Sequence, residues 1–461
     1  MQMGLKQLDS ESRQLYSLLA KIAVPIALQS LIGSSLNLVD NLMVGSLGEK
    51  ELAAVGVGVQ IYFIFWMIVY GFSSGCSTFM AQFWGARDIR GIRKTIGFTL
   101  MVSMSVGLLF FAGGMFFPDK IIRIFTDIPD IVRLGSIYVK AGALCFIFIA
   151  LNTAFELAFR ATQQTHIPMI ASIIAFATNT FLNYILIFGN FGAPRLGVAG
   201  AAIATVFSRF IQTCILMFIV FGRKNIIAGS LSSYFGWTKI FVLRVVKNSI
   251  PTTINETMWG IGTAMYVAAF ARIGVTEYAS VQAGNTIQNL LQMAAFSIGD
   301  AILIMVGQKL GEGEKERAYS MAGRLLRIGT VIGGIFGLLL IAIARPVISM
   351  FNFTAAGEKY TFYILIVYGL TMWLVVFNGM VVTGVLRCGG DTRFSMFTET
   401  GTVWCIAVPL AFITALLLHW PVYFCILAIK SEELVKACIL FWRYKSKKWV
   451  RDMVSGIRTD A

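Results

Sequence analysis

One polar stretch lies inside the first long apolar run of the sequence: residues 34–45 read SSLNLVDNLMVG. The run extends from Ile22 to Leu47, and roughly 20 helical residues suffice to cross a bilayer. It nevertheless carries Asp40, with no basic residue within two helical turns on either side. Because a carboxylate is expensive to hold inside a membrane, such acids are typical of functional sites. We therefore expect Asp40 to face protein or water. The alternative is that it only bonds a neighbouring helix.

The composition predicts a membrane protein that crosses the bilayer many times. Of the 461 residues, 57% are hydrophobic and 13% are charged, whereas soluble domains carry about 25% charged residues. The net charge of +15 would favour nucleic acid binding in a soluble protein. Here the basic residues lie in short loops, so we expect a lipid bilayer as the partner and no nucleic acid. The 7 cysteines are scattered through apolar segments without metal-ligand spacing, and we interpret them as buried apolar residues.

Apolar runs separated by short charged or Gly/Pro-containing loops predict an all-α polytopic protein of about twelve transmembrane helices. The longest connection follows the sixth run. It divides the chain into an N-lobe of residues 1–222, a cytoplasmic linker of residues 223–246, and a C-lobe of residues 247–461 with a short basic tail. The expected helices cover residues 18–46, 53–84, 92–117, 131–158, 166–189, 196–221, 247–272, 278–308, 319–345, 358–386, 394–418 and 421–442.

The basic residues also predict the orientation of the chain. About 26 of the 38 lysines and arginines lie on the side of the N-terminus, and about 9 lie in the opposite loops. Positive charge stays on the cytoplasmic face of membrane proteins. We therefore expect both termini to be cytoplasmic, in a multi-pass protein of the plasma membrane.

The two halves of the sequence repeat each other at an offset of 226 to 228 residues. Each half has six helices, so both enter the membrane in the same direction, and a shared site is expected between two pseudo-symmetric lobes. Such internal symmetry favours a transporter. Matched positions include Pro25 and Pro251, Gln82 and Gln308, Gly85 and Gly311, and Arg160 and Arg387.

The intramembrane acids are the residues that the repeat does not preserve. If they were needed to build the fold, both halves should contain them, so their asymmetry favours ion or substrate chemistry. Asp300 and Glu399 are the weaker candidates, because they lie near the cytoplasmic ends of their helices. The mismatched pairs are Asp40 with Tyr266, Glu256 with Ser30, Asp300 with Ser74, and Glu399 with Ser172.

Several helices carry polar stripes that these acids could face. Asn179 and Asn183 are four residues apart and share one face of the fifth helix, and Thr205 in the sixth adds a small oxygen ligand. Asn37 shares a helical face with other polar residues near Asp40. Interhelical hydrogen bonding is the alternative for each stripe. The eighth helix has the longest one: Gln282, Asn285, Asn289 and Gln292.

The sequence contains no pattern of an enzyme. His166 and His419 are the two histidines, and they lie in loops on opposite faces of the membrane, so they cannot form a joint metal site or triad. No phosphate-binding loop of the Walker type occurs, so ATP is not expected to drive the protein. We expect no cofactor.

At this point the motifs resemble one family. VDN at residues 39–41 with MVG at 43–45 is similar to the first-helix signature of the multidrug and toxic compound extrusion (MATE) transporters. LRCGGDT at 386–392 resembles the family's loop after helix ten. The other matches are QFWG at 82–85, QKLG at 308–311, and Asn179 to Asn183 followed by YILIFG at 184–189.

The resemblance implies a twelve-helix fold of two six-helix lobes that exports small organic cations in exchange for inward Na⁺ or H⁺. The family's N-lobe cation site carries over to Asp40, Asn179, Asn183 and Thr205, with Asp40 as the metal ligand if the ion is Na⁺. Two departures leave the ion open. Asn183 stands where one branch of the family has a second acid. Another branch pairs a glutamate of helix seven with an acid of helix ten, whereas this chain has Glu256 in helix seven and Asn378 in helix ten. We expect a monomer.

Two other functions compete with cation export. A lipid-linked precursor flippase of related fold would need cationic groups in its cavity, whereas Arg209 is the one arginine far from helix ends and the unpaired intramembrane charges are mostly acids. A passive channel would not explain a two-lobe repeat with unrepeated acids.

Overall fold

The computed structural model describes residues 2–349 and 353–458. Every element in these residues is helical, as the sequence predicted. The first half comprises α1 (Gln2–Gly45), α2 (Glu49–Gly85), α3 (Ile89–Phe116), α4 (Pro118–Arg123), α5 (Pro129–Ala141), α6 (Cys145–Ala161), α7 (His166–Phe188), η1 (Asn190–Gly192), α8 (Val198–Met217), η2 (Phe218–Gly222) and α9 (Leu231–Tyr234). The second half comprises α10 (Lys239–Phe270), α11 (Val275–Gly311), α12 (Lys315–Ile348), α13 (Ala355–Gly379), η3 (Met380–Leu386), α14 (Thr392–Thr402), η4 (Val403–Ala407), α15 (Val408–Phe412), η5 (Ile413–Leu417) and α16 (Val422–Lys445).

The helices are long and apolar enough to confirm an all-α, multi-pass membrane protein. In the described residues, 9 helices pass a test of length and hydropathy for crossing a membrane, and the bent pair α5 and α6 makes up to 10. α10 and α16, with 32 and 24 residues, also cover predicted spans but are not among these 9 helices. Four charged residues lie in the middle of α16, at Lys430, Glu432, Glu433 and Lys436, and two more, Arg443 and Lys445, lie in its last turn.

The fourth predicted helix is broken rather than continuous. α5 and α6 meet at an angle of 52°. Gly142 ends α5, and a Cβ atom at this position would lie 2.2 Å from the Tyr62 hydroxyl oxygen. The side chain of Tyr62, on α2, therefore packs against the bend, where glycine leaves room for its hydroxyl. The sequence prediction of one helix over residues 131–158 missed this break.

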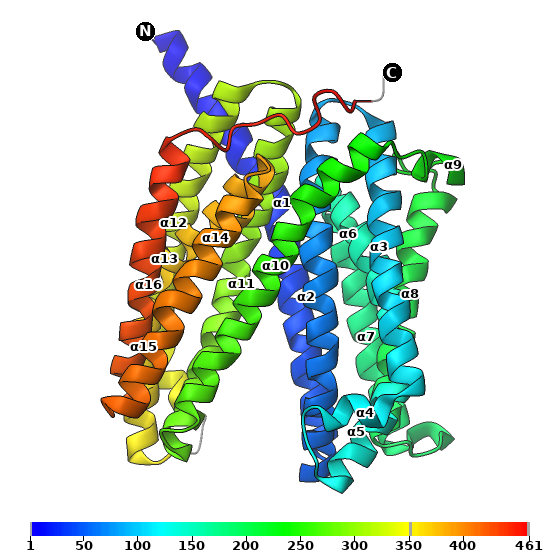
Figure 1. Ribbon diagram of the computed structural model, residues 1–461, viewed down its shortest axis with the longest axis vertical. Coiled ribbons are helices and arrows are strands. Elements are labelled where there is room, and N and C mark those ends of the chain that lie inside the picture. The colour runs from blue at the N-terminus through cyan, green and yellow to red at the C-terminus, as the bar shows by residue number, and fades with distance from the viewer. Residues whose placement is uncertain (1, 350–352, 459–461) are drawn as a thin grey trace. The chain divides into compact units, whose positions relative to one another are not determined.

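The described chain divides into two compact units. The N-terminal unit contains residues 28–80 and 87–249. The C-terminal unit contains residues 250–456 together with the chain as far as Ala27 and residues 81–86. Within each unit the long helices run side by side (Figure 1). α1 and α2 thus each contribute residues to both units.

Two matched motifs pack against each other in the C-terminal unit. A Cβ atom on Gly85 would lie 2.0 Å from the carbonyl oxygen of Gln308, and one on Gly311 would lie 1.9 Å from that of Gln82. The ends of α2 and α11 therefore cross in backbone contact, and only glycine fits at either position. This reciprocal contact explains why QFWG and QKLG recur at the same place in both halves.

The segment after α16 is held firmly to the C-terminal unit. Trp449 is fully buried, and its backbone passes so close to Gly389 that a Cβ atom there would clash. The side chain of Gln82 donates to the carbonyl of Cys388 at 2.7 Å and accepts from the amide of Met453 at 2.6 Å. The segment therefore ties together α2, the loop before α14, and the end of α16.

Candidate functional site

Three helices of the N-terminal unit bring polar side chains together around Asp40. Asp40 lies on α1, Asn179 and Asn183 stack one turn apart on α7, and Thr205 lies on α8. The Nδ2 atom of Asn183 donates to Oδ1 of Asp40 at 2.5 Å and to Oδ1 of Asn179 at 3.0 Å. Asn179 in turn donates to the Thr205 hydroxyl oxygen at 3.3 Å. These four residues form one hydrogen-bonded chain, which we call the Asp40 site.

The Asp40 site depends on close packing of α7 against α8. Asn179 and Asn183 are fully buried. A Cβ atom on Gly200, near the start of α8, would lie 2.5 Å from the carbonyl oxygen of Leu186. Because glycine stands there, the backbones of the two helices approach closely, and Thr205 comes within reach of Asn179.

One oxygen atom of the Asp40 site has no partner. Oδ1 of Asn183 is buried and accepts no hydrogen bond from any described residue. Leaving such an acceptor unsatisfied costs about 1–3 kcal/mol, so the position favours a proton donor or a cation. Carboxylate, amide and hydroxyl oxygens are the ligands that hard cations prefer. The residues of the site therefore fit a small cation.

A basic residue acts on this site from one turn away. Arg209 follows Thr205 by four residues on α8 and interacts electrostatically with Asp40. Its Nη1 atom donates to Oε1 of Gln212 at 3.0 Å. The direct partner of the Asp40 carboxylate is therefore an amide, and the positive charge contributes at longer range.

A second polar cluster in the N-terminal unit was not expected from the sequence. Arg160 of α6 donates to Oε1 of Gln29 on α1 at 2.8 Å, and Gln29 donates to the Ser172 hydroxyl on α7 at 3.2 Å. Gln212 of α8 bonds four neighbours, at 2.7 to 3.3 Å. These neighbours are Asn152, Glu156, Ser172 and Arg209, and the whole set with Gln29, Arg160 and Gln212 is called the Gln212 cluster.

In the C-terminal unit, the carboxylate of Glu256 forms an ion pair with an arginine. Arg387 donates to Oε1 of Glu256, with the arginine side chain almost fully buried. The neighbouring Asn255 donates to Oε2 of Glu399 at 2.5 Å. This pairing of Glu256 with Arg387 was not predicted from the sequence. Arg387 was matched to Arg160 by the repeat, a signal that could have indicated a shared structural role.

Two further acids of this unit surround a lysine. Lys436 is 3% exposed, and its Nζ atom lies 2.5 Å from Oε1 of Glu432 and 3.6 Å from Oε2 of Glu433. Asn378 of α13 donates to the Glu433 carboxylate at 2.7 Å. Lys436 also interacts electrostatically with Glu399. We call Asn378, Glu399, Glu432, Glu433 and Lys436 the Lys436 cluster.

The remaining sequence candidates do not form one site. Asn285 accepts from the Tyr368 hydroxyl at 2.7 Å, and Gln292 accepts from Gln288 at 3.0 Å, so the stripe of α11 is partly used in hydrogen bonds within the unit. Asp300 is half-buried on α11. Tyr266 lies within electrostatic range of Glu432 and Lys436. The exposed side chains are Asn37, Gln282 and Asn289.

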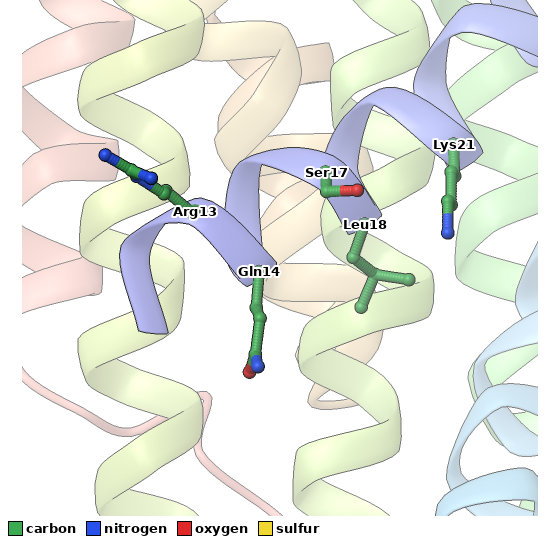
Figure 2. A pocket seen from close by; sticks show the side chains of 5 residues that line it. All are labelled: Arg13, Gln14, Ser17, Leu18 and Lys21. Atoms are coloured by element: carbon green, nitrogen blue, oxygen red, sulfur yellow. The ribbon is translucent and has the colours of Figure 1, made fainter. Parts of the chain in front are cut away.

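A hollow of about 350 Å³ lies beside the first turns of α1. Figure 2 shows its lining side chains, among which Gln14, Leu18 and Lys21 extend to the same side of the helix. All of them belong to α1, and none belongs to the Asp40 site or the Lys436 cluster. We therefore do not assign the hollow to the candidate site.

Comparison with known proteins agrees with this architecture. The sequence profile of the MatE family matches residues 25–185 and again residues 249–413. A probable multidrug resistance protein YoeA of Bacillus subtilis is 24% identical over 396 residues, which cover 85% of each chain. A probable multidrug resistance protein NorM of Thermotoga maritima is 25% identical over 409 residues, which cover 86% of this chain and 84% of the relative.

Solved structures show the same fold. The crystal structure of MATE in the straight conformation superposes with a TM-score of 0.85 at 18% identity, over 94% of this chain and 96% of that one. A transporter of the MOP superfamily from Pyrococcus furiosus superposes with a TM-score of 0.83. Because the family profile matches more than half of the sequence, once in each half, the chain belongs to the MatE family of membrane transporters and is not an enzyme.

Proposed function

We propose that this protein is a secondary active multidrug efflux antiporter, which exports small organic cations in exchange for inward Na⁺ or H⁺. It would act as a monomer in the plasma membrane, with both termini in the cytoplasm. Several relatives are named multidrug resistance proteins, which supports the substrate class. The observation that carries the proposal is the half-buried carboxylate of Asp40, held by Asn183 beside a buried amide oxygen that has no partner among the described residues.

The Asp40 site supports coupling because it can exist in two states. With the site loaded, a cation would contact the oxygens of Asp40, Asn183, Asn179 and Thr205, whereas a proton would reside on the Asp40 carboxylate. With the site empty, the Asp40 carboxylate accepts a hydrogen bond from the Asn183 amide. A ligand shifts a conformational equilibrium by its difference in affinity for the two states, and such a difference is what links ion entry to cargo exit.

The driving force follows from charge balance. The membrane potential contributes about 2.3 kcal/mol per 100 mV for each net charge that crosses. An exchange of one monovalent ion for one monocationic cargo moves no net charge, so the ion gradient alone would drive it. Cargo without charge would make the same exchange sensitive to the potential.

Ethidium transport by purified protein in proteoliposomes tests the proposal. Imposed Na⁺ and pH gradients are applied separately, and ethidium accumulation is followed by fluorescence. We expect uphill transport with one of the two gradients and its loss in Asp40→Asn. Equilibration without accumulation would indicate a channel. Absence of ethidium transport together with translocation of a lipid-linked pyrophosphate would indicate the flippase function.

A further inference from the structure

The Gln212 cluster and the C-terminal polar residues are two copies of one arrangement. Asn152 donates to the backbone carbonyl of Arg209 at 3.2 Å, and Asn378 donates to that of Glu433 at 2.8 Å. The residue three positions further along the helix is Gln212 in the first copy and Lys436 in the second. Lys436 therefore occupies the place that Gln212 holds in the N-terminal unit.

The remaining contacts correspond as well. In the N-terminal unit, Gln29 both accepts from Arg160 and donates to Ser172. In the C-terminal unit these two contacts are divided between adjacent residues, because Glu256 accepts from Arg387 and Asn255 donates to Glu399. Gln29, Arg160 and Ser172 match these residues at the repeat offsets of 226 to 227, whereas Arg209 and Glu433, and likewise Gln212 and Lys436, are 224 positions apart. The geometry is thus conserved while the charge of the side chains differs.

Charge and unsatisfied oxygen atoms distinguish the second copy. The C-terminal copy has carboxylates at Glu432 and Glu433 around a central ammonium, whereas the corresponding centre of the N-terminal copy is the neutral amide of Gln212. Among the described residues, Oε2 of Glu432 and Oδ1 of Asn378 are buried acceptors without a hydrogen-bond partner. The cluster therefore presents more acceptor oxygens than the three hydrogens of one ammonium can satisfy.

We propose that Lys436 is a tethered cation, whose ammonium fills a monovalent-cation site formed by Glu432, Glu433 and Asn378. Oxygen donors of this kind bind a small cation, and the lysine supplies one covalently. The C-terminal unit then needs no ion from solution. Ion coupling is confined to the Asp40 site, where no lysine takes the place of the ion.

Removal of the lysine charge tests this inference independently of transport. The variant is Lys436→Gln, which installs the residue of the other copy, in an Asp40→Asn background that removes the N-terminal site. The melting temperature of the purified protein is measured at constant ionic strength in sodium, potassium and choline chloride. We expect Na⁺ or K⁺ to raise the melting temperature by about 2–5 °C over choline, and the Asp40→Asn parent to show no such difference.

Controls determine what each result means. Glu433→Gln added to Lys436→Gln should abolish the cation effect, because it removes a proposed ligand. A cation effect already present in the Asp40→Asn parent would overturn the proposal, as would a folded Lys436→Gln variant with no cation effect. If Lys436→Gln fails to fold in every salt while Lys436→Gln/Glu432→Gln folds, Lys436 is only an ion-pair partner, and the proposal is also wrong.

Discussion

Asp40 of the N-terminal unit is held differently from three acids of the C-terminal unit, Glu256, Glu432 and Glu433. In the C-terminal unit, Glu256 is paired with Arg387, and Glu432 and Glu433 are paired with Lys436. In the N-terminal unit, the direct partner of Asp40 is the amide of Asn183. A carboxylate whose counter-charge is built into the protein has little use for a cation from solution. Of these acids, Asp40 is therefore the one whose charge a cation from solution can balance.

The arginine contacts offer the largest expected effect. Arg387→Ala leaves Glu256 as an unpaired buried charge, which costs about 3–5 kcal/mol of stability. Arg160→Ala removes the donor to the neutral amide of Gln29, at about 1–3 kcal/mol. The nearby carboxylate of Glu156 keeps the Gln212 amide and the charge of Arg209. We expect a much lower yield and melting temperature for Arg387→Ala than for Arg160→Ala, with Arg223→Ala in an exposed position as the control.

The double variant Arg387→Ala/Glu256→Gln sharpens this test, because it removes both charges. It should recover a melting temperature close to that of Arg160→Ala. Equal losses from the two single arginine variants would show that Glu256 does not depend on Arg387.

A smaller effect is expected from the amide that holds Asp40. Asn183→Ala removes the hydrogen bond to Asp40 and the unpartnered oxygen, but keeps the carboxylate. Loss of a residue that orients or supplements an ion ligand typically lowers affinity about 10–100-fold. We therefore expect the ion concentration for half-maximal ethidium efflux to rise by about this factor. An unchanged ion dependence would remove Asn183 from the site.

The smallest effect concerns Glu256 itself. Glu256→Gln makes the contact with Arg387 resemble the amide contact of Gln29 with Arg160, so the fold should persist. We expect efflux to change by about 2- to 5-fold, which corresponds to about 0.4–1 kcal/mol, and to change more than in Asp300→Asn. Efflux assays at matched protein abundance compare the two. The reverse order would identify Asp300 as the more important acid of the C-terminal unit.

Much of this organisation could be predicted from the sequence. The apolar runs gave the helices, and the i, i+4 spacing of Asn179 and Asn183 placed both amides on the face that meets Asp40 and Thr205. The bend at Gly142 could not be predicted, because the Tyr62 side chain that packs against it comes from a distant part of the chain.

The polar clusters were missed for a related reason. Hydrogen bonds between four helices depend on rotation about each helix axis, and an apolar run does not define this rotation. The pairing of Glu256 with Arg387 joins residues that are 131 positions apart, and only the matched Arg160 hinted at it. Glu432 and Glu433 lie four and three residues before Lys436 on one helix, so this spacing alone predicts that they pair.

The most direct test of the central claim compares wild type with Asp40→Asn in proteoliposomes. Accumulation of ethidium in the lumen is measured under an outward-directed Na⁺ gradient, an outward-directed proton gradient, and no gradient, at equal amounts of folded protein, because an antiporter moves its cargo against the direction of ion flow. We predict that one gradient drives accumulation in wild type, and that Asp40→Asn accumulates no ethidium under any of the three conditions. Gradient-driven accumulation in Asp40→Asn at the wild-type rate would contradict the assignment of ion coupling to Asp40.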